Sequence, residues 1–394
     1  MWRLMNNFDH RLYKLSRQKL QSLARRRMPH MRTSVVRRQS TQQGESTWIS
    51  GENEKPQRQL RWGIAPINIL AEDFVTATTT LPPEKHRITA CMGTYRSQAL
   101  EFADRYKVPN VFTSFEDLAR CPDVDAVYIS PLNCMHCELC HLMLNHDKHV
   151  LCEQPLCMAE QQVVQLVTKA KARGLFLMEG VWSRCLPSYE YMRSEIAKSK
   201  LGVVYDVRCR LGWELPNAQT SSSAYAGVTR NWAADCIQLA LWIYQEVPMF
   251  VRVDGKLNDA GVDIIAEIEL SFRNNRRAVL ELSAEKNLAN MATIRGTKDC
   301  IIMNNFWSPT LLFFNNREVE FKLPTTECKT YFDSRVGMCY EIEEARKCIL
   351  NGRTESKLFN HSESQLMVNL IDQITDMMAV KDKHVKVQRV AAIQ

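Results

Sequence analysis

Val150-Leu151-Cys152-Glu153-Gln154-Pro155 joins an apolar run to a polar pair near the middle of the chain. Residues 148–152 predict a strand, the last of a series of similar strands that begins at Leu60. The stretch therefore falls where a first folded half of the chain ends and a second half begins.

Short apolar runs alternate with helical stretches before this junction. The runs predict strands at 60–65, 88–92, 125–129 and 148–152, and the intervening stretches predict helices at 69–80, 97–106 and 135–146. Continuous apolar strands that alternate with helices imply a parallel sheet covered on both faces. The order predicts a Rossmann-type nucleotide-binding domain, with its ligand at the carboxyl ends of the strands.

The length of 394 residues is enough for two domains, since a domain takes roughly 150 residues. No run approaches the ~20 apolar residues that a membrane-spanning helix needs, so no membrane span is predicted. The fourteen cysteines are spread through core-like stretches, and no secretory apolar segment precedes them. This usage predicts reduced thiols in an intracellular compartment rather than a disulfide framework.

The formal charge of +7 is concentrated at the start of the chain, where residues 1–60 hold 13 Lys and Arg against 4 Asp and Glu. The rest is slightly acidic, so nucleic-acid binding by that part is not predicted. Residues 1–42 place apolar side chains on one side of a predicted basic helix (Leu4, Phe8, Leu12, Leu15). Such a helix is what a mitochondrial import presequence requires, which predicts a matrix location. The alternative is a disordered basic tail on a cytoplasmic protein.

A dinucleotide-binding turn after the first strand should carry a Gly-x-Gly-x-x-Gly/Ala pattern. This chain has Pro66-Ile67-Asn68-Ile69-Leu70-Ala71 there. Glycine lets the backbone approach a pyrophosphate closely, whereas Pro66 also removes an N–H donor. Asn68 is the milder change, because asparagine can adopt a positive φ. The turn keeps Ala71 but predicts weakened dinucleotide affinity.

Several blocks in a fixed order carry a family resemblance. They are Leu60-Arg61-Trp62-Gly63-Ile64, Ser130-Pro131-Leu132-Asn133-Cys134-Met135-His136, Val150 to Pro155, Arg173 to Arg184, Arg295-Gly296-Thr297-Lys298 and Gly337-Met338-Cys339-Tyr340-Glu341. Residues from about 60 to 380 resemble the glucose-fructose oxidoreductase and inositol dehydrogenase superfamily. They are most similar to its dimeric dihydrodiol dehydrogenases, also described as NADP-dependent D-xylose dehydrogenases, of which this chain is a divergent member.

The resemblance implies an α/β fold with an N-terminal Rossmann-type domain and a C-terminal α+β domain that has an open, mostly antiparallel sheet. It implies NADP as cofactor, a small-molecule substrate and a homodimer formed through the second sheet. The expected division is a basic extension and linker at 1–59, the dinucleotide-binding domain at 60–183, the substrate and dimerisation domain at 184–380, and a tail at 381–394. Strand-like runs after Gly202, several of them alternating in polarity, agree with the second sheet.

The catalytic positions that the resemblance implies are substituted. The family's Glu-Lys-Pro lysine helps to relay a proton as hydride leaves carbon, and Gln154 stands at that position. Glutamine can orient a hydroxyl but cannot act as a general acid or base. A family helix carries Asp and, four residues later, Tyr or His, which places Asn231 and Asp235 there on one helical face. Asp235 is chemically able to serve as a base, or it is a merely structural aspartate.

The remaining site positions follow from the same resemblance. Thr94 stands where the dihydrodiol dehydrogenases have an arginine that suits the 2′-phosphate of NADP. Arg96 either pairs with that phosphate or is a plain surface charge. The family's loops on the nicotinamide side and its substrate-cleft wall are retained at Ser130, Pro131, Asn133, His136, Glu153, Trp182 and Arg184.

The spacing of Cys134, Cys137 and Cys140 also occurs in iron–sulfur proteins. The segment overlaps a helix expected to pack on the sheet, and cysteine is a common small core residue, so no metal is predicted. Two functions remain. One is an NADP-dependent oxidoreductase that acts on a dihydrodiol or an aldose, with activity weakened or lost through the substitutions. The other is a catalytically inactive relative that serves as a binding or dimerisation module.

Overall fold

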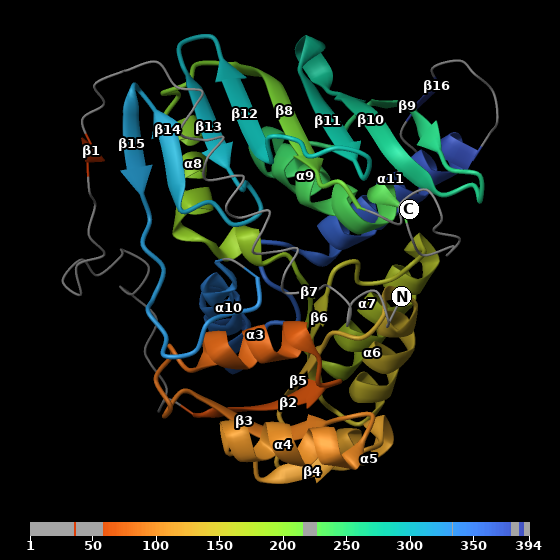
Figure 1. The fold of residues 1–394 in the computed structure, drawn as a ribbon, viewed down its shortest axis with the longest axis vertical. Helices are drawn as coiled ribbons and strands as arrows, with labels where there is room; N and C mark the ends of the chain where they lie inside the picture. Colours follow the sequence, from red (N-terminus) through yellow and green to blue (C-terminus); the bar gives the residue numbers. More distant parts are fainter. Residues whose placement is uncertain (1–34, 37–57, 216–226, 333, 380–385, 390–394) are drawn as a thin grey trace.

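The computed structural model describes residues 35–36, 58–215, 227–332, 334–379 and 386–389. Its strands form two sheets, and several helices lie between them (Figure 1). The predicted import helix in residues 1–42 lies outside the described residues, which there include only β1 (Val35–Val36).

The first sheet is parallel throughout. Its strands lie in the order β4 (Asn110–Phe112), β3 (His86–Met92), β2 (Leu60–Ala65), β5 (Ala126–Ile129), β6 (His149–Glu153) and β7 (Leu177–Gly180). This is the doubly wound order in which the direction of winding reverses between the first strand and its neighbour. The predicted Rossmann-type sheet is confirmed, and the reversal point lies between β2 and β5.

Helices cover both faces of this sheet. One face packs against α3 (Ile69–Thr78), α4 (Arg96–Tyr106) and α10 (Met338–Leu350). The other packs against α5 (Phe115–Arg120), α6 (His136–Asn145) and α7 (Glu160–Arg173). Helix α10 comes from near the end of the chain, and its Met338 and Ile342 join the core around Trp62 and Phe74. The first core is thus completed by a segment that follows the second sheet.

The second sheet is mostly antiparallel. Its order is β1, β15 (Arg317–Glu320), β14 (Leu311–Phe314), β13 (Cys300–Asn304), β12 (Met291–Gly296), β8 (Val204–Gly212), β11 (Arg277–Ser283), β10 (Asp263–Ser271), β9 (Phe250–Leu257) and β16 (Lys386–Arg389). Among the described strands of this second sheet, only the pairs β8–β11 and β1–β15 are parallel. The predicted open, mostly antiparallel sheet is confirmed.

One face of the second sheet is covered by α8 (Pro187–Ala197), α9 (Val228–Tyr244) and α11 (His361–Ala379), as Figure 1 shows. Burial alternates along the strands, so that Val251 and Val253 of β9 face this core while Arg252 is exposed. Period-two alternation is what a sheet with one packed face requires. No helix among the described residues has the length and apolar character needed to cross a membrane.

Candidate active site

Gln154 and Asp235 meet although they lie 81 residues apart in the sequence. Gln154 follows the carboxyl end of β6, and its Nε2 donates a hydrogen bond of 3.2 Å to Oδ1 of Asp235 in α9. Two of the three substituted positions that the resemblance assigned to catalysis are therefore in direct contact. Asn231, one turn earlier in α9, instead donates from Nδ2 to the carbonyl oxygen of Gly227 at 2.9 Å.

The start of α9 is fixed by a carboxylate from the second sheet. Asp263 of β10 accepts a 2.7 Å hydrogen bond from the backbone N–H of Thr229, one of the donors that a helix leaves unpaired in its first turn. Gly227 precedes the helix at φ 110°, and a Cβ there would come within 1.9 Å of Asp263 Oδ1. Only glycine therefore fits this approach of backbone to carboxylate. Asp263 thus helps to set where the helix presents Asp235.

Burial dominates the protonation of Asp235. Loss of water around the carboxyl raises its pKa from 3.8 to about 6, while the hydrogen bond from Gln154 opposes the rise. The charge of Glu153 raises the pKa further and that of Arg335 lowers it. The ionised form is consequently available near neutral pH, but as a stronger base than an exposed aspartate.

Gln154 retains one unused hydrogen-bonding atom. Its Oε1 is buried without a partner among the described residues. The chain beside it is held from both sides, because Leu156 N–H donates to Oε1 of Glu179 at 3.0 Å and His136 Nδ1 lies 2.7 Å from the Pro155 carbonyl oxygen. A fixed loop with an unpartnered acceptor is suited to hydrogen-bond an O–H group.

His136 is buried and contacts two loops, one through Pro131 and the other through Pro155. It is 1 % exposed, and its Nε2 lies 3.3 Å from the carbonyl oxygen of Pro131. Burial lowers its pKa, so the neutral imidazole is favoured. Its predicted place at a cofactor is therefore indirect, through Pro131 and Pro155. Asn133 lies close by in η1 (Asn133–Met135) and is partly exposed.

The turn after β2 is organised by Asn68. Its Oδ1 accepts from the N–H of Ala71 at 2.9 Å, which caps α3, and its Nδ2 donates to the carbonyl oxygen of Ser130 at 2.5 Å. Asn68 thus bridges the carboxyl ends of β2 and β5. Its φ of −159° shows that the left-handed conformation allowed for asparagine is not used here. The N–H groups of Ile69 and Leu70 have no partner among the described residues.

The carboxyl end of β3 is open at the surface. Thr94 and Arg96 are both exposed there, and Arg96 begins α4. The side chain of Arg96 makes no hydrogen bond or ion pair with another described residue. A free guanidinium at this edge of a nucleotide-binding sheet can meet a phosphate.

Arg335 is the site residue that sequence reasoning missed. It lies in η5 (Arg335–Gly337), and its Nη2 donates to Oε1 of Glu153 at 2.5 Å. The side chain is 11 % exposed and its guanidinium carbon lies 5.7 Å from the ring centroid of Trp182. Nothing local in the sequence signals this pairing, because the two partners are 182 residues apart.

Residues 60–181 match the oxidoreductase family with an NAD-binding Rossmann fold. A trans-1,2-dihydrobenzene-1,2-diol dehydrogenase of Xenopus tropicalis is 32 % identical over 325 residues, covering 81 % of this chain and 98 % of that relative. The relative of the same name in Homo sapiens is 31 % identical over 326 residues, with 82 % and 97 % covered. The chain belongs to this oxidoreductase family.

Solved structures show the same fold at lower sequence identity. The aldose-aldose oxidoreductase of Caulobacter crescentus superimposes with a TM-score of 0.70 at 18 % identity, covering 84 % of this chain and 100 % of that one. A levoglucosan dehydrogenase complexed with NADH and levoglucosan gives a TM-score of 0.72 at 16 % identity, with 85 % and 100 % covered. At these identities the likeness establishes the family fold alone.

The prediction that Arg184 lines the substrate cleft requires correction. The side chain is completely buried. It donates to Oε1 and the backbone oxygen of Gln238, each at 2.7 Å, and pairs with Glu363 at 3.1 Å. The guanidinium also lies over the Trp242 ring, 4.7 Å from its centroid. In this oxidoreductase Arg184 therefore links α9 to α11, because its guanidinium is paired with Gln238 and Glu363 inside the second core.

The cysteine-rich start of α6 contributes to packing. Cys140 is fully buried among apolar side chains that cover the first sheet, and all fourteen cysteines are free thiols. Within the residues that the structure describes, no three His, Cys, Asp or Glu side chains are placed to hold a metal ion.

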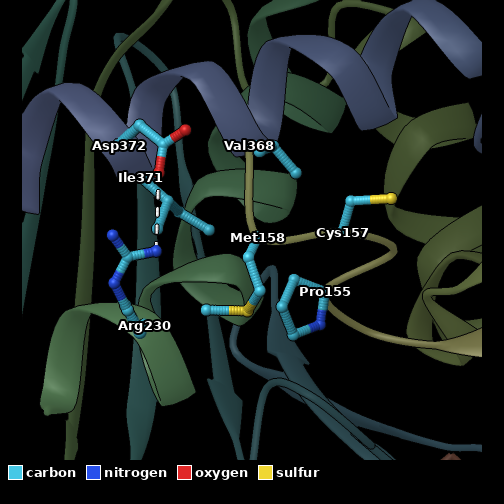
Figure 2. Close-up of a pocket in the computed structure, with 7 residues that line it drawn as sticks. All are labelled: Pro155, Cys157, Met158, Arg230, Val368, Ile371 and Asp372. Carbon is cyan, nitrogen blue, oxygen red and sulfur yellow. Dashed lines mark hydrogen bonds and ion pairs between the residues drawn. The ribbon is translucent and has the colours of Figure 1, made fainter. Parts of the chain in front are cut away.

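A small pocket lies behind the loop that follows Gln154. Figure 2 shows it between Pro155, Met158 and helix α11, with the 3.4 Å ion pair of Arg230 and Asp372 at one side. Its volume of about 210 Å³ includes the open mouth. Because the 210 Å³ includes open solvent, the enclosed cavity is smaller than this and cannot accommodate a dinucleotide.

Proposed function

We propose that this chain is an NAD(P)-dependent oxidoreductase for a hydroxyl group of a small diol or aldose, with Asp235 as the proton acceptor. The observation that carries the proposal is the contact between Gln154 and the partly buried carboxylate of Asp235. A bound nicotinamide would supply the hydride chemistry, which the protein's own residues cannot provide.

Gln154 and Asp235 together replace the family's lysine: Gln154 orients the substrate hydroxyl, and Asp235 accepts its proton. The unpartnered Oε1 of Gln154 accepts a hydrogen bond from the substrate hydroxyl and orients it. Asp235 takes the proton, which its pKa of about 6 allows once the pH exceeds that value. A carboxylate therefore replaces the missing amine as general base.

The protein groups at the strand ends fit a dinucleotide phosphate. The unpartnered N–H groups of Ile69 and Leu70 lie at the start of α3, where the helix dipole favours an anion. Pro66 contributes no donor, so the first strand–helix turn offers fewer contacts than a glycine-rich turn. The exposed Arg96 supports a preference for NADP, because its guanidinium can pair with a 2′-phosphate.

Relatives with dihydrodiol dehydrogenase names and sugar-handling structural neighbours support the substrate class. A trans-dihydrodiol and D-xylose both offer a secondary hydroxyl beside another hydroxyl, which suits one acceptor and one base. For the whole chain we further infer a homodimer formed through the open face of the second sheet and a mitochondrial matrix location, the alternative being the cytoplasm.

A non-catalytic role is the second candidate. Gln154 cannot act as a general acid or base. The side chain of Asn68 also fills the turn where the family fingerprint has glycine. A protein with these features could bind a partner or a nucleotide without turnover.

The test is NADP-linked oxidation of D-xylose and of trans-1,2-dihydrobenzene-1,2-diol by the wild type and Asp235→Asn. Loss of the base should lower kcat by 100-fold or more, a typical value for proton-transfer assistance, while NADPH affinity is unchanged. The control is Asp372→Asn in α11, whose carboxylate pairs with Arg230 instead. Unaltered turnover in Asp235→Asn would refute the assigned role, and NADPH binding without any wild-type turnover would support the non-catalytic candidate.

A further inference from the structure

We propose that Arg335 is a positioning residue for the Gln154–Asp235 pair, acting through Glu153 at the end of β6. The inference rests on the proposed role of Asp235 as proton acceptor. It assigns a function to Tyr331, Phe332 and Arg335, which the sequence alone does not connect with the site.

Glu153 is held by two groups from different parts of the chain. Its Oε1 accepts a hydrogen bond from the Tyr128 hydroxyl of β5 and another from Arg335. Glu153 is 8 % exposed, so an ionised carboxylate there needs a compensating charge. Arg335 supplies it, since it is the only cation in ion-pair contact with Glu153 among the described residues.

Arg335 is itself anchored to α3. The carboxylate of Asp73, fully buried in that helix, accepts from the N–H groups of Tyr331 at 2.6 Å and Phe332 at 3.2 Å. It also lies 3.6 Å from Nε of Arg335. The loop before α10 is therefore fastened to α3 and, through Arg335, to the end of β6.

This arrangement reaches Asp235 in two ways. Glu153 immediately precedes Gln154, so fixing Glu153 fixes the backbone from which Gln154 reaches α9. The charges of Glu153 and Arg335 also act on the Asp235 carboxyl with opposite signs, the first raising and the second lowering its pKa. The other titratable groups that interact with Asp235 are Tyr189 and Cys236, both of which are buried.

A purely structural tie would behave differently from a positioning residue. If Arg335 only fastens the loop to the first sheet, its removal lowers stability and leaves the titration of Asp235 unchanged. If it also sets the site, the titration of Asp235 moves in a direction fixed by the sign of the charge that was removed.

The experiment follows the carboxyl carbon resonance of Asp235 in protein labelled with ¹³C-aspartate, assigned through Asp235→Asn, as the pH is varied. Arg335→Met should raise the midpoint by about one unit, because an attractive charge is lost. Glu153→Gln should lower it. The double variant should lie near the wild type, because the opposing influences of the two charges on Asp235 are removed together.

Two further variants sharpen the test. Arg335→Lys keeps the charge and should restore a midpoint near the wild-type value. Arg346→Met is the matched control, since Arg346 is a buried arginine of α10 that binds the backbone oxygens of Lys85 and Arg58, away from the site. It should leave the midpoint unchanged.

An unmoved midpoint in Arg335→Met, or equal shifts in Arg335→Met and Arg346→Met, would overturn the proposal. The readout is a resonance of Asp235 rather than turnover. It therefore gives an answer even if Asp235→Asn has no effect on activity, and the failure of one proposal can be told from the failure of the other.

Discussion

At the scale of single residues, the proposed function gives Asp235 the proton transfer for which the family uses a lysine. Its carboxylate is partly buried, and its stabilising contact is one hydrogen bond from an uncharged amide. Burying an incompletely compensated carboxylate disfavours its ionised form. The residue therefore carries a stability cost, and under the proposed function it supplies a base near neutral pH in return.

Asp235→Asn should accordingly stabilise the protein at neutral pH. The folded-state pKa of about 6 lies above the unfolded value of 3.8, so the folded state binds the proton more tightly and stability falls as the pH rises between these values. Asparagine does not ionise and can still accept from Gln154. The melting temperature of the variant, measured by calorimetry, should exceed that of the wild type at pH 7.5, with the difference vanishing near pH 4. A constant difference across this range would contradict the assignment.

Sequence reasoning found part of this site and missed part of it. The family resemblance assigned Gln154 and Asp235 to one catalytic site, and the structure places them in contact. Arg335 and Arg184 could not be judged in the same way. Whether a distant arginine ends in a cleft, in a core or on a carboxylate depends on tertiary packing, which no local pattern records.

Among the secondary-structure elements, helix α9 is the one on which the site depends most. Its first turn is fixed by Asp263, and Asp235 lies two turns from its start. The strands β2, β3, β5 and β6 and the helices α3, α4 and α6 were predicted from apolar runs and periodicity. The short edge strand β4, with Asn110 partly buried, was not, because a three-residue strand has too few positions to show a pattern.

Asp263→Ala should destabilise the protein by about 1 kcal/mol, the usual cost of losing a helix N-terminal cap. The variant should also weaken substrate turnover, because the start of α9 is no longer held to β10. Urea unfolding followed by circular dichroism measures the first effect. The comparison variant is Asp254→Ala on exposed β9, whose carboxylate accepts only from the adjacent Gly255 N–H among the described contacts. Equal stability losses in the two variants would argue against the capping role.

At the scale of the whole molecule, one face of the second sheet is not covered by a described helix. Half-buried apolar side chains such as Ile302 and Phe313 face outward from β13 and β14. Basic residues lie on β8 (Arg208, Arg210), whereas acidic ones lie on β10 (Glu267, Glu269). These arginines are paired within the chain, Arg208 with Asp206 and Arg210 with Glu281, so the support for the proposed homodimer rests on the apolar part of the face.

Ile302→Asp should dissociate such a dimer, because it places a charge in the apolar part of the proposed interface. Light scattering coupled to size exclusion should then report the monomer mass of 45.5 kDa. Leu100→Asp, which changes a 48 % exposed leucine on α4, should leave the dimer intact. A wild type that is already monomeric at micromolar concentration would refute the dimer.

The proposed oxidoreductase function requires above all that the substituted Rossmann domain still binds its cofactor. Titration of the purified protein with NADPH, followed by cofactor fluorescence, tests this directly. We predict saturable binding, with affinity lowered roughly tenfold in Arg96→Ala, about the loss of one charge-assisted contact, while NADH affinity is unaffected. Absence of binding at millimolar NADPH would contradict the oxidoreductase function.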